Sequence, residues 1–159
     1  MDLKNTANYF VAFRKLLRSY TDYQMRELKD YDLSPNEIVV LSSIGSVGLA
    51  SEIAENACVS KALVSRSVKQ LKDKGLITAT ISTVDKREQT LRLTDEGEKV
   101  AERIAEANHK FYVAAFKRFE DNEKRVLQAL LGLMLQNLES EDEYENSHLS
   151  KTGSCKTFG

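Results

Sequence analysis

The stretch from Ser60 to Gly75 constrains the fold more than any other part of the chain, because the sequence specifies both its ends and both its faces. Serine is a favoured N-cap residue and glycine is favoured just beyond a helix C-terminus, so we expect a helix from Lys61 to about Lys74. One narrow arc of that helix holds the apolar residues Val64, Val68 and Leu71. The opposite side holds the small and basic residues Ala62, Arg66 and Lys69, flanked by Leu63 and Ser65. The helix is therefore predicted to bury one side and to expose a small, positively charged side.

The segments on either side of this helix predict a supersecondary motif. A short helix over 50–56 and a tight break at 57–59 precede it, so two helices are joined by a turn. Beyond Gly75, apolar residues alternate over 77–81 and again at Leu91 and Leu93, on either side of a polar turn centred on 84–88. Such alternation predicts a β-hairpin. The order of these elements is that of a helix-turn-helix followed by a wing.

Four further helices are predicted around this motif. The first spans about 5–29, the second follows a capping-box signature at Ser34 and Glu37, the third starts after Thr94 and runs to about Phe119, and the last spans about 121–138. The apolar faces of the first and last helices are broad enough to indicate a helical dimer interface. We therefore predict a mainly α fold with a small β-hairpin wing (α+β). The expected parts are a winged helix-turn-helix over 33–94, a helical dimerisation region over 1–32 and 95–140, and a disordered acidic and polar tail over 141–159.

Composition excludes several classes of protein. With 42% hydrophobic and 30% charged residues and no long apolar run, the chain is typical of a soluble globular protein and not of a membrane protein. The N-terminus lacks the pattern of a secretory signal, so a cytoplasmic location is expected. The two cysteines and two histidines are not spaced as metal ligands, and no phosphate-binding loop or nucleophile motif is present. We therefore expect no cofactor, no metal site and no enzymatic activity.

Charge is unevenly distributed along a chain whose formal net charge is only −1. Residues 60–92 contain eight lysines and arginines and three acidic residues. A basic patch within a nearly neutral protein is a candidate electrostatic footprint for nucleic acid, although it could also be a solvated helix face.

Two segments resemble the MarR family of transcription regulators. The helix-turn-helix resemblance lies in Glu52-Ile53-Ala54, in Val59 to Arg66 and in Leu71 to Ile77. The wing resemblance lies in Asp85-Lys86-Arg87, followed by Leu91-Arg92-Leu93-Thr94 and Gly97. The resemblance covers about residues 5–139. It implies an obligate homodimer, made by pairing the first helix with the last two, whose wings and recognition helices grip double-stranded DNA at a near-palindromic operator. It also implies control by a small-molecule ligand or an oxidant in many members.

The candidate DNA-binding residues lie on the predicted recognition helix and on the wing: Ser60, Lys61, Leu63, Ser65, Arg66, Lys69, Asp85, Lys86 and Arg87. Arg66 and Lys69 face away from the core, where an arginine can read a guanine edge or contact phosphate. Leu63 can touch a thymine methyl or pack beneath a neighbouring helix. Arg87 at the wing tip is the strongest single candidate, because a narrow minor groove attracts arginine. Asp85 would orient the turn and not contact DNA directly.

A second group of residues is a candidate effector pocket, where the resemblance implies binding of an aromatic anion: Arg18, Tyr20, Tyr23, His109 and Tyr112. Each could equally be a core or interface residue. Cys58 precedes the recognition helix and could act as a redox switch, but a buried structural cysteine is the preferred interpretation. Cys155 lies in the predicted tail and has no expected role.

Two hypotheses therefore compete. The first is a dimeric DNA-binding regulator, a repressor by the tendency of the family. The alternative is a helical dimer that docks on other proteins through its winged domain, although the basic bias of residues 60–92 argues against it.

Overall fold

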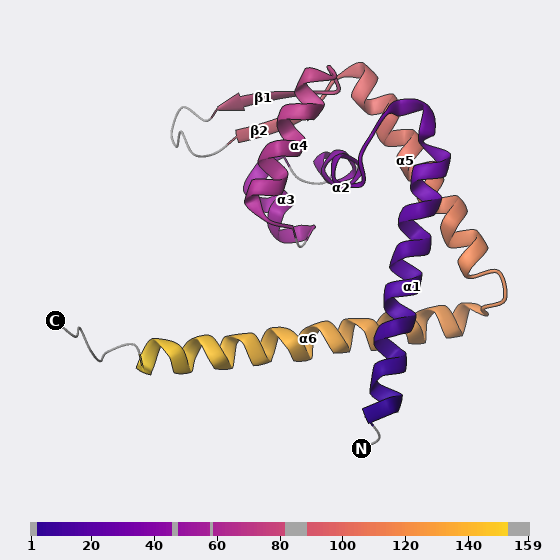
Figure 1. The fold of residues 1–159 in the computed structure, drawn as a ribbon, viewed down its shortest axis with the longest axis vertical. Coiled ribbons are helices and arrows are strands. Elements are labelled where there is room, and N and C mark those ends of the chain that lie inside the picture. Colours follow the sequence, from indigo (N-terminus) through magenta and orange to yellow (C-terminus); the bar gives the residue numbers. More distant parts are fainter. Residues whose placement is uncertain (1–2, 46–47, 58, 82–88, 153–159) are drawn as a thin grey trace. The chain divides into compact units, whose positions relative to one another are not determined.

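The computed structural model describes residues 3–45, 48–57, 59–81 and 89–152, with the side chains of residues 8–138 and 140 among them. The elements in chain order are α1 (Leu3–Glu27), the 3-10 helix η1 (Lys29–Tyr31), α2 (Pro35–Ile44), α3 (Ala50–Asn56), α4 (Lys61–Asp73), β1 (Ile77–Ile81), β2 (Gln89–Leu93), α5 (Asp95–Ala115) and α6 (Asp121–Thr152) (Figure 1). Residues 1–115 form one compact unit and residues 116–159 a second. None of the described helices is long and apolar enough to cross a membrane.

The predicted helix-turn-helix and hairpin are both confirmed. Helix α3 is followed by α4, and β1 pairs antiparallel with β2 in a register that places Ile77 opposite Leu93. An isolated bridge between Leu49 and Thr90 extends the pairing to the segment before α3, and the Leu91 amide donates to the Gly48 carbonyl at 2.7 Å. The hairpin is therefore attached to the start of α3 as well as to the end of α4.

One core holds this unit together. Its largest fully buried apolar residues come from five elements: Ile38 and Leu41 of α2, Ile53 of α3, Val64 and Leu71 of α4, Leu91 of β2, and Val100 and Ile104 of α5. The predicted apolar arc of α4 is thus confirmed as its buried side. Ile81, the last apolar residue of the first alternating segment, is instead 56% exposed. It ends β1, and burial of the apolar side chains along this strand decreases from Ile77, which lies in the core, to Ile81. In Figure 1 the hairpin extends away from α4 and α5.

Helix α1 packs against α5 through its C-terminal half. Gln24 and Leu28 are buried there, and Tyr20 and Tyr23 both make edge-to-face contacts with Phe111 of α5, with ring centroids 5.1 Å and 5.7 Å apart. The part of α1 that precedes Tyr20 exposes large apolar side chains, such as Tyr9, Phe10, Leu16 and Leu17. Within the second unit, α6 exposes a comparable set that includes Leu130, Met134, Leu135 and Leu138. Apolar surface on this scale is typical of a protein that associates with a partner.

Two predicted boundaries are wrong. Helix α5 ends at Ala115 and not at Phe119, because a turn closed by the Phe119 amide and the Phe116 carbonyl, 3.0 Å apart, intervenes before α6. Neither glycine nor proline marks that turn in the sequence. Helix α6 continues to Thr152, through much of the segment that was predicted to be disordered from residue 141. The acidic segment contains several glutamates, which favour helix, and no glycine or proline before residue 153 to end it.

Candidate nucleic-acid interface

Helix α4 presents its small and basic side to solvent because its other side is held in the core. The Ser60 hydroxyl accepts a hydrogen bond from the Leu63 amide at 3.2 Å, as expected of an N-cap, which starts the helix. Val64, Val68 and Leu71 are buried, together with Ser67. Lys61, Ala62, Ser65, Arg66 and Lys69 are exposed on the opposite side. The amphipathic division predicted from the sequence is therefore confirmed.

The exposed side of α4 forms a ridge between two surface hollows. One hollow is lined by Leu63, Arg66 and Lys69 of α4 together with Ser34 and Asn36 at the start of α2. The other is lined by Lys61 and Ser65 of α4, by Ala50 and Ser51 of α3, and by Gln89 of β2. Leu63 is half-buried at the edge of the first hollow. A ridge of this kind, one helix wide, has the shape that enters a DNA major groove.

The positive charge of this ridge is offset only in part, by Asp73, which lines the first hollow together with Lys69. Among the described residues, no ion pair involves Lys61, Arg66 or Lys69. Their side chains are therefore available to a polyanion. Asn36, Gln70 and Gln89 line the same hollows and can donate hydrogen bonds, yet nothing in their sequence pattern distinguished them.

The predicted wing-tip residues Asp85, Lys86 and Arg87 lie outside the described residues, as does Cys58. The two strands that lead to the wing tip are described, and Thr94 connects the end of β2 at Leu93 to the start of α5 at Asp95. The roles of Asp85, Lys86 and Arg87 stay predictions.

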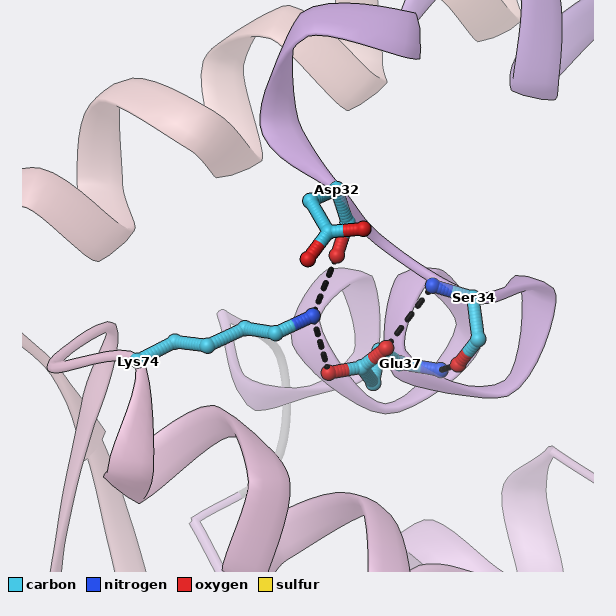
Figure 2. Close-up of polar contacts among 4 residues, drawn as sticks. All are labelled: Asp32, Ser34, Glu37 and Lys74. Carbon is cyan, nitrogen blue, oxygen red and sulfur yellow. Dashed lines mark hydrogen bonds and ion pairs between the residues drawn. The ribbon is translucent and has the colours of Figure 1, made fainter.

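The sequence analysis missed a buried ion pair between α2 and the end of α4. The Glu37 side chain is 2% exposed, and its Oε1 lies 2.8 Å from Nζ of Lys74, whose side chain is 31% exposed. The Lys74 ammonium also donates to the Asp32 carbonyl (Figure 2). Glu37 in addition forms the predicted capping box, because its Oε2 accepts from the Ser34 amide at 2.7 Å and its amide donates to the Ser34 hydroxyl at 3.3 Å. A buried carboxylate requires a positive partner, but the sequence does not indicate which lysine supplies it.

These contacts determine the charge state of Glu37. Burial acts to raise its pKa, but the hydrogen bonds from Lys74 and from the amide and hydroxyl of Ser34, with the positive charge of Lys74, outweigh burial. The pKa of Glu37 is therefore lowered from its ordinary value, and the carboxylate is ionised at neutral pH.

The C-terminal end of α4 is also attached to α5. The Leu76 amide donates to the Leu71 carbonyl and the Gly75 amide to the Lys72 carbonyl, which is the Schellman pattern, with Gly75 at a φ of 70°. The Thr94 hydroxyl donates to the Gly75 carbonyl at 2.7 Å and the Thr94 amide to the Leu76 carbonyl at 3.0 Å. The exit from α4 is thus bonded directly to Thr94, the residue that immediately precedes α5.

Of the five predicted effector residues, two lie together in the contact between α1 and α5, and the other three lie elsewhere on the surface. Tyr20 and Tyr23 flank Phe111, and the Arg26 guanidinium lies 4.6 Å from the centre of the Tyr23 ring. The Tyr20 hydroxyl donates to Asn108 Oδ1 at 2.9 Å and accepts from Gln24, and burial raises its pKa. Three predicted residues are exposed instead: Arg18, which pairs with Asp22 on α1, and His109 and Tyr112 on α5. The described residues contain no group of three or more His, Cys, Asp or Glu that could hold a metal ion.

Comparison with known proteins agrees with this architecture. Residues 33–89 match the model of the MarR family. The HTH-type transcriptional repressor MdtR of Bacillus subtilis is 28% identical over 138 residues, which cover 86% of this chain and 88% of that protein. A MarR protein from Peptoclostridium difficile has a similar structure, with a TM-score of 0.78 and 26% identity over 84% of this chain and 89% of that chain.

A structure of mutant MarR from E. coli complexed with operator DNA shares the fold. Its TM-score is 0.72 at 20% identity, and the match covers 85% of this chain and 99% of that chain. The family-model match spans the helix-turn-helix and the first part of the wing, and the relatives match most of the chain. Residues 33–89 therefore match the MarR family, and most of the chain is similar to MarR-type transcription regulators.

Proposed function

We propose that this chain is a dimeric, sequence-specific DNA-binding transcription regulator that acts as a repressor in the cytoplasm. Helix α4 would enter the major groove, and the wing would reach the adjacent minor groove with Arg87. The observation that carries the proposal is the exposed basic ridge of α4, whose lysines and arginine have no ion-pair partners among the described residues. The repressor MdtR and the operator complex of MarR support it by similarity.

The dimer is proposed to form through residues 1–32 and 95–140, leaving 33–94 as the DNA-binding part. A dimer interface formed by these residues would cover the exposed apolar side chains of α1 and α6, which neither compact unit buries on its own. Two recognition helices related by a two-fold axis require an operator that is close to a palindrome. The proposal includes no chemical step, since the relatives are transcription regulators.

A small aromatic anion is the proposed effector class. Tyr23 and Phe111 provide aromatic surface, and Arg26 beside Tyr23 provides a positive charge. A shallow hollow between α1 and α5 is lined by Tyr23, Arg26 and Phe111, and also by Asp22, whose carboxylate pairs with Arg18. Tyr20 packs against Phe111 but does not line this hollow. Arg18, His109 and Tyr112 have no part in this hollow.

The test is binding to a fluorescent duplex from the upstream region of the gene, with a scrambled duplex as competitor and a salt series. We expect tight binding that resists the scrambled competitor and weakens steeply as salt rises. Replacing Lys61, an exposed lysine in the first turn of α4, with alanine should reduce the slope of log affinity against log salt by about 0.9 per lost phosphate contact, or about 1.8 for a dimer.

Lys99→Ala is the matched control. Lys99 also carries one positive charge, but it lies on α5 in an exposed pair with Glu96. The control should leave both the affinity and the salt slope close to those of the unmodified protein. Binding that is weak and indifferent to sequence and salt would contradict the proposal and favour docking on a protein.

A further inference from the structure

The contacts at the C-terminal end of α4 suggest a positioning role for Lys74 that goes beyond the proposed contacts with DNA. Lys74 is the C-cap residue of α4, and its backbone amide donates to the Gln70 carbonyl at 3.0 Å. Its side chain extends away from α4 to Glu37 of α2 and to the carbonyl of Asp32, which connects η1 to α2 (Figure 2). One side chain thus joins the end of α4 to α2 and to the connection that directly precedes α2.

Packing of one side of α4 against α2, α3 and β1 sets its general direction, and the polar contacts at its C-terminal end fix that direction more closely. Val64, Val68 and Leu71 are the apolar residues in that packing, and packing of this kind permits crossing angles that scatter by about 15–20°. The hydrogen bonds from Thr94 act on Gly75 and Leu76, two consecutive residues, and therefore restrain the end of α4 near a single point. The Lys74 contacts attach this end to a different part of the unit. They are directional, and they involve a carboxylate that is 2% exposed.

A small tilt at Lys74 is amplified at the base-reading residues. Arg66 precedes Lys74 by eight residues, or about 12 Å along the helix axis. A tilt of about 5° then displaces the backbone of Arg66 by about 1 Å, which exceeds the tolerance of about 0.5 Å for a functional site. Hydrogen bonds to base edges depend on such alignment, whereas attraction to phosphate does not.

We propose that Lys74 is a positioning residue for DNA recognition: through Glu37 and the Asp32 carbonyl it holds α4 at the angle at which Arg66 and Lys69 reach the bases. The side chain does this without touching DNA. The same contacts link the orientation of α4 to the connection between α1 and α2, because Asp32 lies in that connection. This inference rests on the proposed DNA-binding function.

The test separates specific from non-specific affinity. An operator is first selected from a pool of randomised duplexes with the unmodified protein, and binding of that operator is compared with binding of a scrambled duplex at one salt concentration. For Lys74→Met, which keeps an unbranched side chain and removes the charge, operator affinity should fall about tenfold or more. Affinity for the scrambled duplex should change by less than about twofold. Lys74→Arg, which keeps the charge and the donors, should restore most of the ratio between the two affinities.

Two further variants control for charge and for folding. Lys99→Met removes one positive charge from an exposed site and should leave the ratio unchanged. The double variant Glu37→Gln, Lys74→Met leaves no unpaired buried charge, so it should remain folded by circular dichroism even if Lys74→Met alone does not. The double variant should still show a reduced ratio of operator affinity to scrambled-duplex affinity, because it lacks the hydrogen bond from the Lys74 ammonium to the Asp32 carbonyl.

Each outcome has a distinct meaning. A folded double variant with an unchanged ratio would overturn the positioning role. Equal weakening on both duplexes would also overturn it, because Lys74 would then contact phosphate directly. Failure of the unmodified protein to enrich any sequence would refute the proposed function itself.

Discussion

Replacing Gly97 with alanine should destabilise the winged unit, because the first turn of α5 lies directly against the backbone that leaves α4. A Cβ at this position would lie 1.9 Å from the carbonyl oxygen of Leu76 and 3.0 Å from its carbonyl carbon. Ordinary contact begins at 3.4 Å, so the two segments must separate by about 1.5 Å. The obstacle is backbone and not the end of a flexible side chain, so a rotamer change cannot relieve it.

The loss in free energy of unfolding follows from the contacts that this separation disturbs. The Thr94 amide bonds to the Leu76 carbonyl and the Thr94 hydroxyl to the Gly75 carbonyl. Loss of two hydrogen bonds costs about 1 kcal/mol each, and overpacking adds about 1–3 kcal/mol. We expect Gly97→Ala to lower the free energy of unfolding by about 3–5 kcal/mol.

Urea denaturation followed by far-UV circular dichroism measures this change, at one fixed protein concentration because a dimer unfolds in a concentration-dependent way. Gly45→Ala is the matched control. A Cβ at Gly45 meets nothing within 4 Å, and its φ of −65° suits alanine, so its unfolding free energy should change by less than about 1 kcal/mol. Equal midpoints for the two variants would refute the close approach of α5 to Leu76.

Three further predictions concern the interface, the buried carboxylate and the α1–α5 contact. Arg87→Ala should weaken operator binding in an anisotropy titration without changing the thermal midpoint; unchanged affinity would remove Arg87 from the interface. The pKa of Glu37 is lowered from 4.5, so its contribution to stability is present above pH 4.5 and is lost as the pH falls through the lowered pKa. Glu37→Gln should therefore flatten the acid side of a plot of unfolding free energy against pH, and an unchanged acid side would show that Glu37 is not the group responsible. Tyr20→Phe removes the hydroxyl bonded to Asn108 and should cost about 1 kcal/mol in urea denaturation, whereas a cost near zero would show that water replaces this bond.

Local patterns in the sequence were sufficient to predict most elements of the fold. Ser34 with Glu37, Ser60 and Gly75 each act on neighbouring backbone groups, so the ends of α2 and α4 follow from a few consecutive residues. The buried and exposed sides of α4 follow from the helical period for the same reason. The end of α5 was not predicted, because the turn after Ala115 is closed by backbone bonding that has no characteristic residue type.

For the candidate DNA interface too, some features followed from local sequence and others required the tertiary structure. The sequence by itself determined that a capped helix with an exposed basic side, including Arg66, stands before a hairpin, since charge and period are local properties. Only the tertiary structure decided which lysine neutralises Glu37 and why position 97 must be glycine. Both depend on segments that are tens of residues apart, which come together only when the core forms. The Lys74 side chain takes its direction from the groups that it bonds to in the folded structure. Those groups have no fixed spacing along the chain, so a local sequence pattern does not predict them.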